Sequence, residues 1–479
     1  MDRKRNGIKL NPYILVIVSF LFIILLGAFL ISMPWANKYH QWIWNLNVDG
    51  HSVTFLDCFF VAVSATCVTG LQTFPSAIVD TLTFGGQLVL MLMIQIGGLG
   101  FITILTFLIT LFKRKLEFRN RYFVSQMVNS TSFADVVKFV RKIILISLIA
   151  ESIGTILLLP VFLNMYGGHI SKGIWVSIFH SVSSFNNAGF DLFKNSLIGS
   201  VVGANGETVS YALYVYLCIV TMILIIAGGI SFMVIVDIFH FKKKPSQWRV
   251  FTKIVLLTSG ILLVGGTLLF ALTDCIKGGN NMTFLDAIFE SVTCRTAGFS
   301  TYAQQDLSSA GKVTACILMF IGGSPLSTAG GIKTTTVYMV VLAMISYFRG
   351  KKVTSFKRTY SNGMIVRAMS LTFMAILIVM IGYVGLCSFG LDPAYNYDDL
   401  HLNTPATMAY GFEVFSAMGT VGLGIGIEPY LSIGSKIVLC FIMFFGRIGP
   451  ITFLQVFQAN MDKETHLHYE YVEEDFLIG

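Results

Sequence analysis

Hydrophobic positions in this chain gather into long unbroken runs rather than alternating with polar positions. A helix of about 20 apolar residues is long enough to cross the hydrocarbon core of a bilayer. Runs of this length or longer recur along the whole chain, so the pattern predicts eight membrane-spanning helices, at residues 13–33, 82–112, 143–162, 211–241, 253–275, 312–347, 369–389 and 435–457.

A shorter apolar piece lies between the first and second runs, the third and fourth, the fifth and sixth, and the seventh and eighth. The four pieces are LDCFFVAVSAT, IWVSIFHSVSS, FLDAIFESVT and AYGFEVFSAM, each 10 or 11 residues long and too short to cross a bilayer. A piece that enters and leaves on one side is re-entrant, and its backbone must be buried in protein or face water. The sequence therefore predicts a unit of helix, re-entrant pore helix and helix, which occurs four times around an axis.

The predicted fold is an all-α polytopic membrane protein, with four repeated units around a pseudo-fourfold pore. The unit boundaries and the remaining tail follow from the runs: pore units at 10–115, 135–245, 250–350 and 365–460, and a cytoplasmic tail at 461–479.

Each short piece ends in small or polar residues, then a glycine, then a large apolar residue: TCVTGL, FNNAGF, CRTAGF and MGTVGL. Glycine tolerates φ > 0 and lets backbones approach closely. Carbonyl oxygens of such segments around an axis can replace the hydration shell of a monovalent cation, and the helix C-termini before them favour positive charge. Glycine-rich turns also serve helix packing, but four in register favour a potassium filter.

The predicted potassium filter comprises the residues at and before each glycine. These are Thr66, Cys67, Val68, Thr69 and Gly70; Asn186, Asn187, Ala188 and Gly189; Arg295, Thr296, Ala297 and Gly298; and Gly419, Thr420, Val421 and Gly422. The Arg295 side chain is expected to face away from the axis, because a fixed cation would raise the barrier to a permeating cation.

Glycine clusters recur a second time, at 96–101, 227–232, 321–331 and 445–450. For the first two, helix kinks or close packing are the favoured interpretation. The third is long and contains Pro325, so it should form an irregular segment below the filter that obstructs permeation. The candidate gate residues are Gly322, Gly323, Ser324, Pro325, Leu326, Ser327, Thr328, Ala329, Gly330 and Gly331, with the intramembrane cations Lys333 and Arg447.

The two intramembrane cations have more than one interpretation. Ionisable residues within a membrane are costly and commonly functional. Arg447 could instead pair with backbone carbonyls or a carboxylate and tie two spans together, and a functional role is the favoured reading.

Composition and charge indicate that the protein lies in a membrane and predict which way it is oriented there. The chain of 479 residues is 55% hydrophobic and 12% charged, whereas soluble domains are about 25% charged. Of the 33 Lys and Arg, 24 lie on one side of the predicted spans, which places both termini in the cytoplasm and weakens any case for nucleic-acid binding. Seven fall on the outer side: Lys38, Lys172, Lys194, Lys277, Arg295, Lys312 and Lys436.

The remaining reactive residues indicate no enzyme. Asp57, Glu290 and Glu413 lie in the re-entrant pieces, where satisfying buried donors is favoured over attracting cations. His180 has no partners at metal-ligand spacing, and the scattered cysteines indicate reduced packing residues. The sequence has neither a phosphate-binding loop nor a nucleophile elbow.

These motifs together resemble the Trk/Ktr/HKT potassium transporter superfamily over essentially the whole chain. The resemblance rests on SATCVTGL, SFNNAGF, TCRTAGF and GTVGLG, on the glycine-rich break in the sixth run, and on FFGRIGPITF in the eighth. Because the first unit starts at residue 13, an additional N-terminal helix pair has no room. The chain is therefore most similar to the membrane subunits of bacterial Ktr systems.

The resemblance implies a function and an assembly. It implies potassium uptake across the bacterial cytoplasmic membrane, with Gly70, Gly189, Gly298 and Gly422 as filter glycines, 322–331 as the gating loop and Arg447 beneath the pore. It implies a homodimer in membrane lipid, gated by a cytosolic ring of KtrA-like subunits that carry the nucleotide, ATP, ADP or NAD. This chain itself would hold no cofactor.

The resemblance also bears on ion choice. Ser at the first filter position accompanies sodium transport in plant relatives, so Gly70 favours potassium as the substrate, with sodium as a candidate coupling ion. Cys294 stands where Ala is common, close enough to the filter to tune it. A symporter with alternating access is the competing mechanism, which parallel rather than inverted units argue against.

Overall fold

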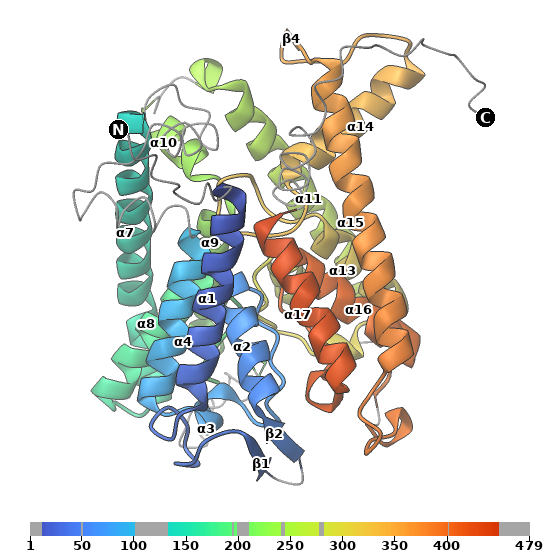
Figure 1. The fold of residues 1–479 in the computed structure, drawn as a ribbon. Helices are drawn as coiled ribbons and strands as arrows, with labels where there is room; N and C mark the ends of the chain where they lie inside the picture. The colour runs from blue at the N-terminus through green and yellow to red at the C-terminus, as the bar shows by residue number, and fades with distance from the viewer. Residues whose placement is uncertain are drawn as a thin grey trace, which may run out of the picture.

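This computed structural model describes residues 12–48, 51–100, 133–193, 196–198, 210–240, 245–276, 282–400 and 402–449. Helices make up nearly all of its regular structure, as the sequence predicts (Figure 1). Residues 101–112 of the predicted second span and the tail 461–479 lie outside the described residues.

The described residues form fifteen α-helices. They are α1 (Pro12–Ser32), α2 (Phe55–Cys67), α3 (Ile78–Thr81), α4 (Phe84–Leu99), α7 (Phe133–Met165), α8 (Ile170–Asn186), α9 (Tyr211–Gly229), α10 (Phe232–His240), α11 (Val250–Phe270), α12 (Phe284–Thr293), α13 (Ser309–Phe320), α14 (Thr334–Phe348), α15 (Asn362–Phe389), α16 (Ala406–Gly419) and α17 (Ile433–Ile448). Shorter helical turns are Pro245–Gln247, Ala271–Ile276, Gln304–Asp306, Tyr397–Leu400 and Glu428–Tyr430.

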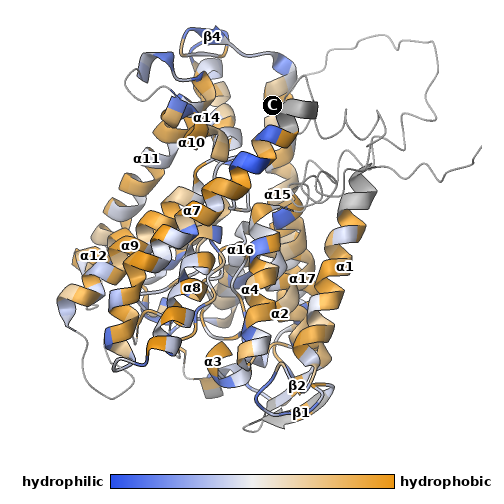
Figure 2. Ribbon diagram, turned by 90° about the vertical axis from the view of Figure 1, so that its left-hand side faces the viewer, coloured by the Kyte–Doolittle hydropathy of each residue, from blue (hydrophilic) through white to orange (hydrophobic). Residues whose placement is uncertain are grey.

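Two small antiparallel hairpins lie at opposite ends of the molecule (Figure 1). In one, β1 (Asn45–Val48) pairs with β2 (His51–Thr54); in the other, β3 (Thr354–Ser355) pairs with β4 (Arg358–Thr359). In Figure 2 hydrophobic positions cover the helices between these ends, and hydrophilic positions gather near the hairpins. The distribution is that of a membrane protein with polar loops on both sides.

Four helical stretches among the described residues are long and apolar enough to cross a membrane: Val137–Met165, Tyr211–Gly229, Val250–Ile276 and Asn362–Phe389. Three of the other predicted spans are shorter among the described residues. The 82–112 and 435–457 runs extend past the described residues, and the 312–347 run is divided into α13 and α14. The 211–241 run also breaks, at Ile230 and Ser231 between α9 and α10.

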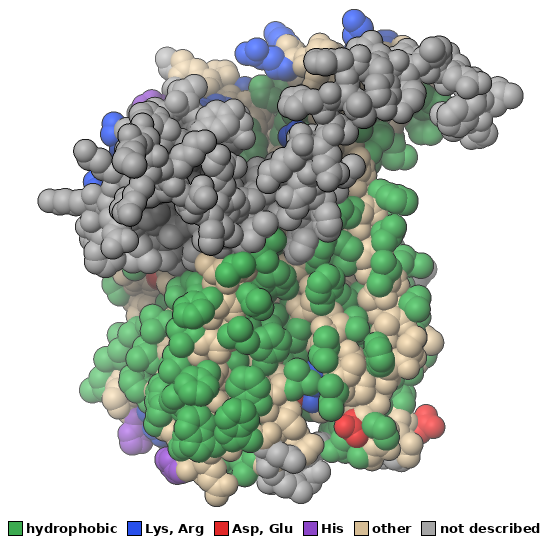
Figure 3. All heavy atoms as spheres, viewed as in Figure 1, with side chains coloured by type: hydrophobic (Ala, Val, Ile, Leu, Met, Phe, Trp, Pro, Cys, Tyr) green, Lys and Arg blue, Asp and Glu red, His purple; other side chains and the backbone are tan. Residues whose placement is uncertain are grey.

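Apolar side chains cover the outside of these helices as well as the inside. Phe22 on α1, Ile156 on α7, Leu268 on α11 and Phe373 on α15 are each more than 60% exposed. Figure 3 shows a broad surface of hydrophobic side chains on one face of the molecule. Such a surface is unfavourable in water and suits the acyl chains of a bilayer.

Each short helix packs between the two longer helices that flank it in sequence. Four trios result, α1–α2–α4, α7–α8–α9, α11–α12–α13 and α15–α16–α17. Neighbouring trios touch through α4 and α8, α9 and α12, and α13 and α16, and α17 then contacts α2. The last trio therefore packs against the first, and the short helices lie inside.

Candidate functional site

The loops that end the four short helices share one backbone shape. Each predicted filter glycine has a positive φ: +105° at Gly70, +69° at Gly189, +81° at Gly298 and +92° at Gly422. The residue two positions earlier is also left-handed in every loop, at Val68, Asn187, Thr296 and Thr420. Non-glycine residues rarely adopt this conformation, so its fourfold recurrence marks one repeated turn.

The four glycines meet at the centre of the molecule. A Cβ placed on Gly70 would lie 2.7 Å from the Ala188 carbonyl oxygen, and one on Gly189 would lie 2.8 Å from that of Ala297. A Cβ on Gly298 would likewise meet the Val421 carbonyl oxygen, and one on Gly422 would meet that of Thr69. Each glycine thus abuts the carbonyl that precedes the next glycine, and the series closes into a ring.

Hydrogen bonds fold each loop back on its helix. Ser64 Oγ accepts from the Gly70 N–H at 3.0 Å, and Ser416 Oγ accepts from the Gly422 N–H at 3.1 Å. In the third loop Thr293 Oγ1 donates to the Phe299 carbonyl at 2.6 Å. These bonds use N–H groups and hydroxyls, and they leave the ring carbonyls without a helical partner.

One cavity of about 460 Å³ lies directly against the ring, and all four glycines line it. Polar side chains, among them Gln72, Asp191, Gln304 and Glu428, form much of its wall. Acidic side chains in a cavity of this kind attract cations to the ring. Asp191 and Glu428 were not among the sequence candidates, because each stands outside the glycine motifs with nothing local to mark it.

The opposite side of the ring faces the 321–333 segment, which connects α13 to α14 without a helix. The prediction of irregular backbone at 322–331 is confirmed. A Cβ on Gly331 would lie 3.2 Å from the Gly419 carbonyl oxygen, and one on Gly330 would meet the Thr420 side chain. The segment therefore lies immediately beneath the fourth loop.

The same segment contacts the glycine clusters of other helices. Ser324 and Thr328 donate backbone N–H groups to Gly229 and Gly228 at 3.2 Å each, and Gly331 donates to Gly446 at 3.3 Å. Gly97 and Gly228 also stand against the carbonyls of Thr66 and Phe185. The first two clusters thus serve close packing, as favoured from sequence, and the second and fourth clusters also accept hydrogen bonds from the segment.

Arg447 and Lys333 hold this segment through backbone oxygens. Arg447 donates from Nη1 to the Thr328 carbonyl, and from Nη2 to the carbonyls of Gly97 and, at 3.2 Å, Gly98. Lys333 Nζ donates to the Ala329 and Gly330 carbonyls at 2.7 and 3.2 Å. Arg447 joins the segment to α4, so the structural tie considered from sequence is present.

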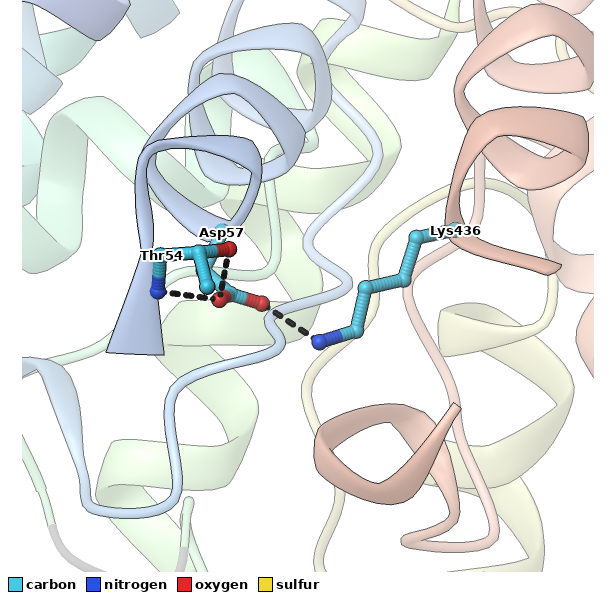
Figure 4. Close-up of polar contacts among 3 residues, drawn as sticks. All are labelled: Thr54, Asp57 and Lys436. Atoms are coloured by element: carbon cyan, nitrogen blue, oxygen red, sulfur yellow. Dashed lines mark hydrogen bonds and ion pairs between the residues drawn. The ribbon is translucent and has the colours of Figure 1, made fainter. Parts of the chain in front are cut away.

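Asp57 at the start of α2 makes an ion pair across the seam between the last trio and the first (Figure 4). Its Oδ1 lies 2.6 Å from Lys436 Nζ on α17, and its Oδ2 accepts from the N–H and hydroxyl of Thr54 at 2.8 and 2.9 Å. Asp57 is 1% and Lys436 8% exposed. The carboxylate satisfies buried donors, which was the favoured interpretation.

Three of the cations that the sequence analysis counted on the outer side are buried in the structure. Besides Lys436, Lys312 Nζ donates to the carbonyls of Gln305 and Leu307 at 2.8 and 2.7 Å. Arg295 bonds Ser259 on α11, with Nη2 3.1 Å from its Oγ. Their positions near helix ends in the sequence resemble loop positions, but buried oxygens satisfy them. Arg295 faces away from the ring, as expected.

The other acidic and histidine candidates also have structural partners. Glu290 accepts from Gln304 Nε2 at 3.1 Å and from Cys294 Sγ at 3.4 Å, and Glu413 accepts from the Ile425 N–H at 2.9 Å. His180 Nε2 lies 3.0 Å from Thr221 Oγ1. In the described part of the chain, no cluster of three or more His, Cys, Asp or Glu is placed to hold a metal.

A polar network behind the second loop escaped the sequence analysis. Asn186 Nδ2 donates to Gln95 Oε1 at 3.0 Å and to Glu151 Oε1 at 3.1 Å, and Ser147 Oγ donates to the same Glu151 oxygen at 2.7 Å. The side chain of Asn186, a predicted filter residue, therefore points into this network rather than to the ring. A lone Glu inside the apolar 143–162 run was the signal available.

Comparison with known proteins gives a consistent result. The sequence profile described as "Cation transport protein", TrkH, matches residues 24–469. The potassium/sodium uptake protein NtpJ of Enterococcus hirae is 34% identical over 100% of this chain and 99% of its own. The Ktr system potassium uptake protein B of Bacillus subtilis is 31% identical over 98% of this chain and 97% of its own.

A solved structure agrees at the level of the fold. The crystal structure of the potassium transporter TrkH from Vibrio parahaemolyticus superposes with a TM-score of 0.65 at 18% sequence identity. The match covers 95% of this chain and 86% of that one. The resemblance predicted from the four glycine motifs is confirmed, and these relatives are transporters rather than enzymes.

Proposed function

The chain belongs to the TrkH family of cation transport proteins, and from this premise we propose that it takes up potassium through the ring of four glycine loops. The observation that carries the proposal is the cyclic contact in which each glycine abuts the carbonyl before the next glycine. Potassium and sodium uptake in the names of its relatives agrees with this substrate.

The ring suits a large monovalent cation for physical reasons. Backbone carbonyls replace the hydration shell without adding full negative charge, so the ion binds and still leaves. The C-terminal ends of α2, α8, α12 and α16 point at the ring and add partial negative charge. The acidic residues Asp191 and Glu428 at the cavity raise the local cation concentration.

The 321–333 segment is the gate in this proposal. It lies beneath the ring. Arg447 and Lys333 donate hydrogen bonds to it, and its own N–H groups donate to backbone carbonyls of α9 and α17. A segment fixed by hydrogen bonds rather than by a continuous helix can be released without unfolding a span. Residues 322–331, Lys333 and Arg447 then act together as a closed barrier.

The assembly belongs to the proposal as well. Eight spans in four units, with both termini in the cytoplasm of a bacterium, put the acidic cavity outside and the gate towards the cytosol. The functional form is a homodimer whose gates respond to a cytosolic ring of KtrA-like subunits. The nucleotide, ATP, ADP or NAD, binds that ring.

An alternating-access symporter is the competing mechanism, with sodium as the coupled ion. The name of the relative NtpJ, a potassium/sodium uptake protein, is consistent with this mechanism. A fixed ratio of sodium to potassium flux distinguishes it from a channel-like pore, in which sodium only sets how often the gate opens.

The decisive experiment is rubidium uptake into liposomes that contain the purified chain. We expect uptake under an inside-negative potential, which supplies about 2.3 kcal/mol per charge per 100 mV. Sodium and a cytosolic partner should change the rate of uptake. A fixed ratio of sodium to rubidium flux would establish coupled transport and contradict the channel-like mechanism, and absence of rubidium flux would contradict the function itself.

A further inference from the structure

A second large cavity lies far from the glycine ring, at the end of the molecule that carries β3 and β4. Its volume is about 890 Å³, and it is formed by the end of α14, the β3–β4 hairpin and the start of α15. We call it the hairpin cavity. The transport mechanism makes no use of it.

The wall of the hairpin cavity divides into an apolar part and a basic part. Met344 on α14 and Ile365 and Met369 on α15 give the apolar part, and Lys351 and Lys352 give the basic part. Both lysines are exposed, and neither has a carboxylate within ion-pair distance among the described residues. A ligand that neutralises this cavity must carry negative charge next to an apolar segment.

Two further groups in the wall are suited to an anion. The Tyr360 hydroxyl is buried and has no hydrogen-bond partner in the described structure, and burial raises the pKa of Tyr360 so that it keeps its proton and can donate. Ser361 and Asn362 begin α15, whose first turn has no side-chain cap. The free N–H groups of a long helix favour a negative charge there.

Exposed aromatic residues place this cavity at the membrane surface. Tyr347 is 86% and Phe348 83% exposed at the end of α14, immediately before the lysines. Amphipathic aromatic rings concentrate at the headgroup level of a bilayer. The Lys and Arg side chains at this end are visible in Figure 3, beyond the hydrophobic surface. The hairpin cavity therefore lies at the depth of the headgroups and combines basic charge with an apolar lining.

We propose that the hairpin cavity binds one anionic phospholipid, with its phosphate between Lys351, Lys352 and the Tyr360 hydroxyl and its acyl chains along α14 and α15. Charge complementarity and the apolar wall together select this occupant. A soluble phosphate satisfies only the basic part, and a zwitterionic lipid gains less from two lysines.

The test measures lipid binding to the full-length chain by native mass spectrometry in detergent, with phosphatidylglycerol and phosphatidylcholine as probes. We expect the chain to prefer phosphatidylglycerol. The double variant Lys351→Gln/Lys352→Gln should bind it about 30-fold more weakly, since each basic residue beside an anionic lipid contributes about fivefold. Glycerol phosphate at millimolar concentration should not displace the lipid.

Lys357→Gln/Arg358→Gln is the matched control, because it removes the same charge from the same hairpin at residues that do not line the cavity. We expect a loss of less than threefold. Equal losses in the two double variants, or equal affinity for the two lipids, would overturn the proposal. Displacement by glycerol phosphate would assign the cavity to a free phosphate instead.

A photo-reactive phenylalanine analogue in place of Tyr360 gives an independent readout in membranes. Crosslinks to phosphatidylglycerol support the proposal. Crosslinks to the acidic residues 466–479 of the same chain would show that the tail occupies the cavity and would overturn it. Because neither measurement depends on ion flux, failure here leaves the proposed potassium uptake untouched.

Discussion

At the scale of single residues, the missing side chain of Gly70 matters more than the side chains around it. Gly70 has a φ of +105°, and a Cβ there would lie 2.7 Å from the Ala188 carbonyl oxygen. Left-handed backbone costs an ordinary residue about 1–2 kcal/mol, and this contact adds to it. A larger residue must therefore displace a carbonyl of the neighbouring loop.

Replacing Gly70 by Ser should weaken the discrimination of potassium over sodium. The displaced Ala188 carbonyl no longer holds its place in the ring, and we expect the ratio of rubidium to sodium influx in liposomes to fall on the order of tenfold, equal to about 1.4 kcal/mol. An unchanged ratio in a folded protein would contradict the filter assignment.

Gly426→Ser is the control for this substitution. Gly426 has a similar φ of +95° and lines the same cavity, but nothing lies within 4 Å of its would-be Cβ. The variant carries the backbone strain without the carbonyl contact. We expect it to retain the potassium preference of the parent chain.

The sequence predicted that the filter glycines lie together, but it did not predict the directions of all the side chains beside them. The glycines repeat in register, so their alignment was available without coordinates. Asn186 lies three positions before Gly189, yet its side chain reaches the Glu151 network. Side-chain direction at the end of a helix depends on the next turn, which periodicity does not specify.

At the scale of elements, the interruption between α13 and α14 is the feature that sets this fold apart from a plain helical bundle. Glycine and proline in 322–331 were enough to predict irregular backbone. They did not predict its partners, since the bonds go to Gly228, Gly229 and Gly446 on helices distant in sequence.

Releasing this element should raise potassium flux. Arg447→Gln removes a charged donor from the Thr328 and Gly97 carbonyls, and such bonds contribute about 1.5–3 kcal/mol. We expect uptake without a cytosolic partner to rise at least about tenfold. Deletion of 322–331 should act in the same direction and further. Loss of flux in both variants, with protein still folded in the membrane, would disprove the gate.

At the scale of the whole molecule, the ring of four trios closes where α17 meets α2. The Asp57–Lys436 ion pair crosses this seam at 2.6 Å and is nearly inaccessible to water. Removing one partner of a buried pair leaves the other charge uncompensated, which costs about 3–5 kcal/mol. The cost of removing one charge therefore depends on whether the other charge is still present.

Lys436→Met should lower the free energy of unfolding by about 3–5 kcal/mol. Asp57→Asn in the same chain should restore most of it, because no bare charge remains. Thermal unfolding in detergent measures both. For comparison, Arg249→Met breaks a pair in which Arg249 is 65% exposed, 3.7 Å from Asp237, and we expect a cost of no more than about 1 kcal/mol. A single variant as mild as Arg249→Met would contradict the account of the seam.

Hydropathy anticipated the trios but not how they join. Runs separated by short pieces indicate three helices that belong together, since a re-entrant piece must be covered by its neighbours. The contacts between trios rest on glycines that admit a neighbouring backbone and on buried polar pairs. Lys436 illustrates the limit: its sequence position, at the outer end of the eighth run, gives no sign of a partner that lies 379 positions away.

The four glycine loops of the ring belong to one chain, and this determines how a single mutation changes the ring. In a pore built from four copies of one subunit, a single codon change alters every wall at once. Here each wall has its own codons, so a mutation changes one quarter of the ring and leaves Gly189, Gly298 and Gly422 as they were. The four walls can therefore change independently of one another, and the four motifs TCVTGL, FNNAGF, CRTAGF and MGTVGL already differ.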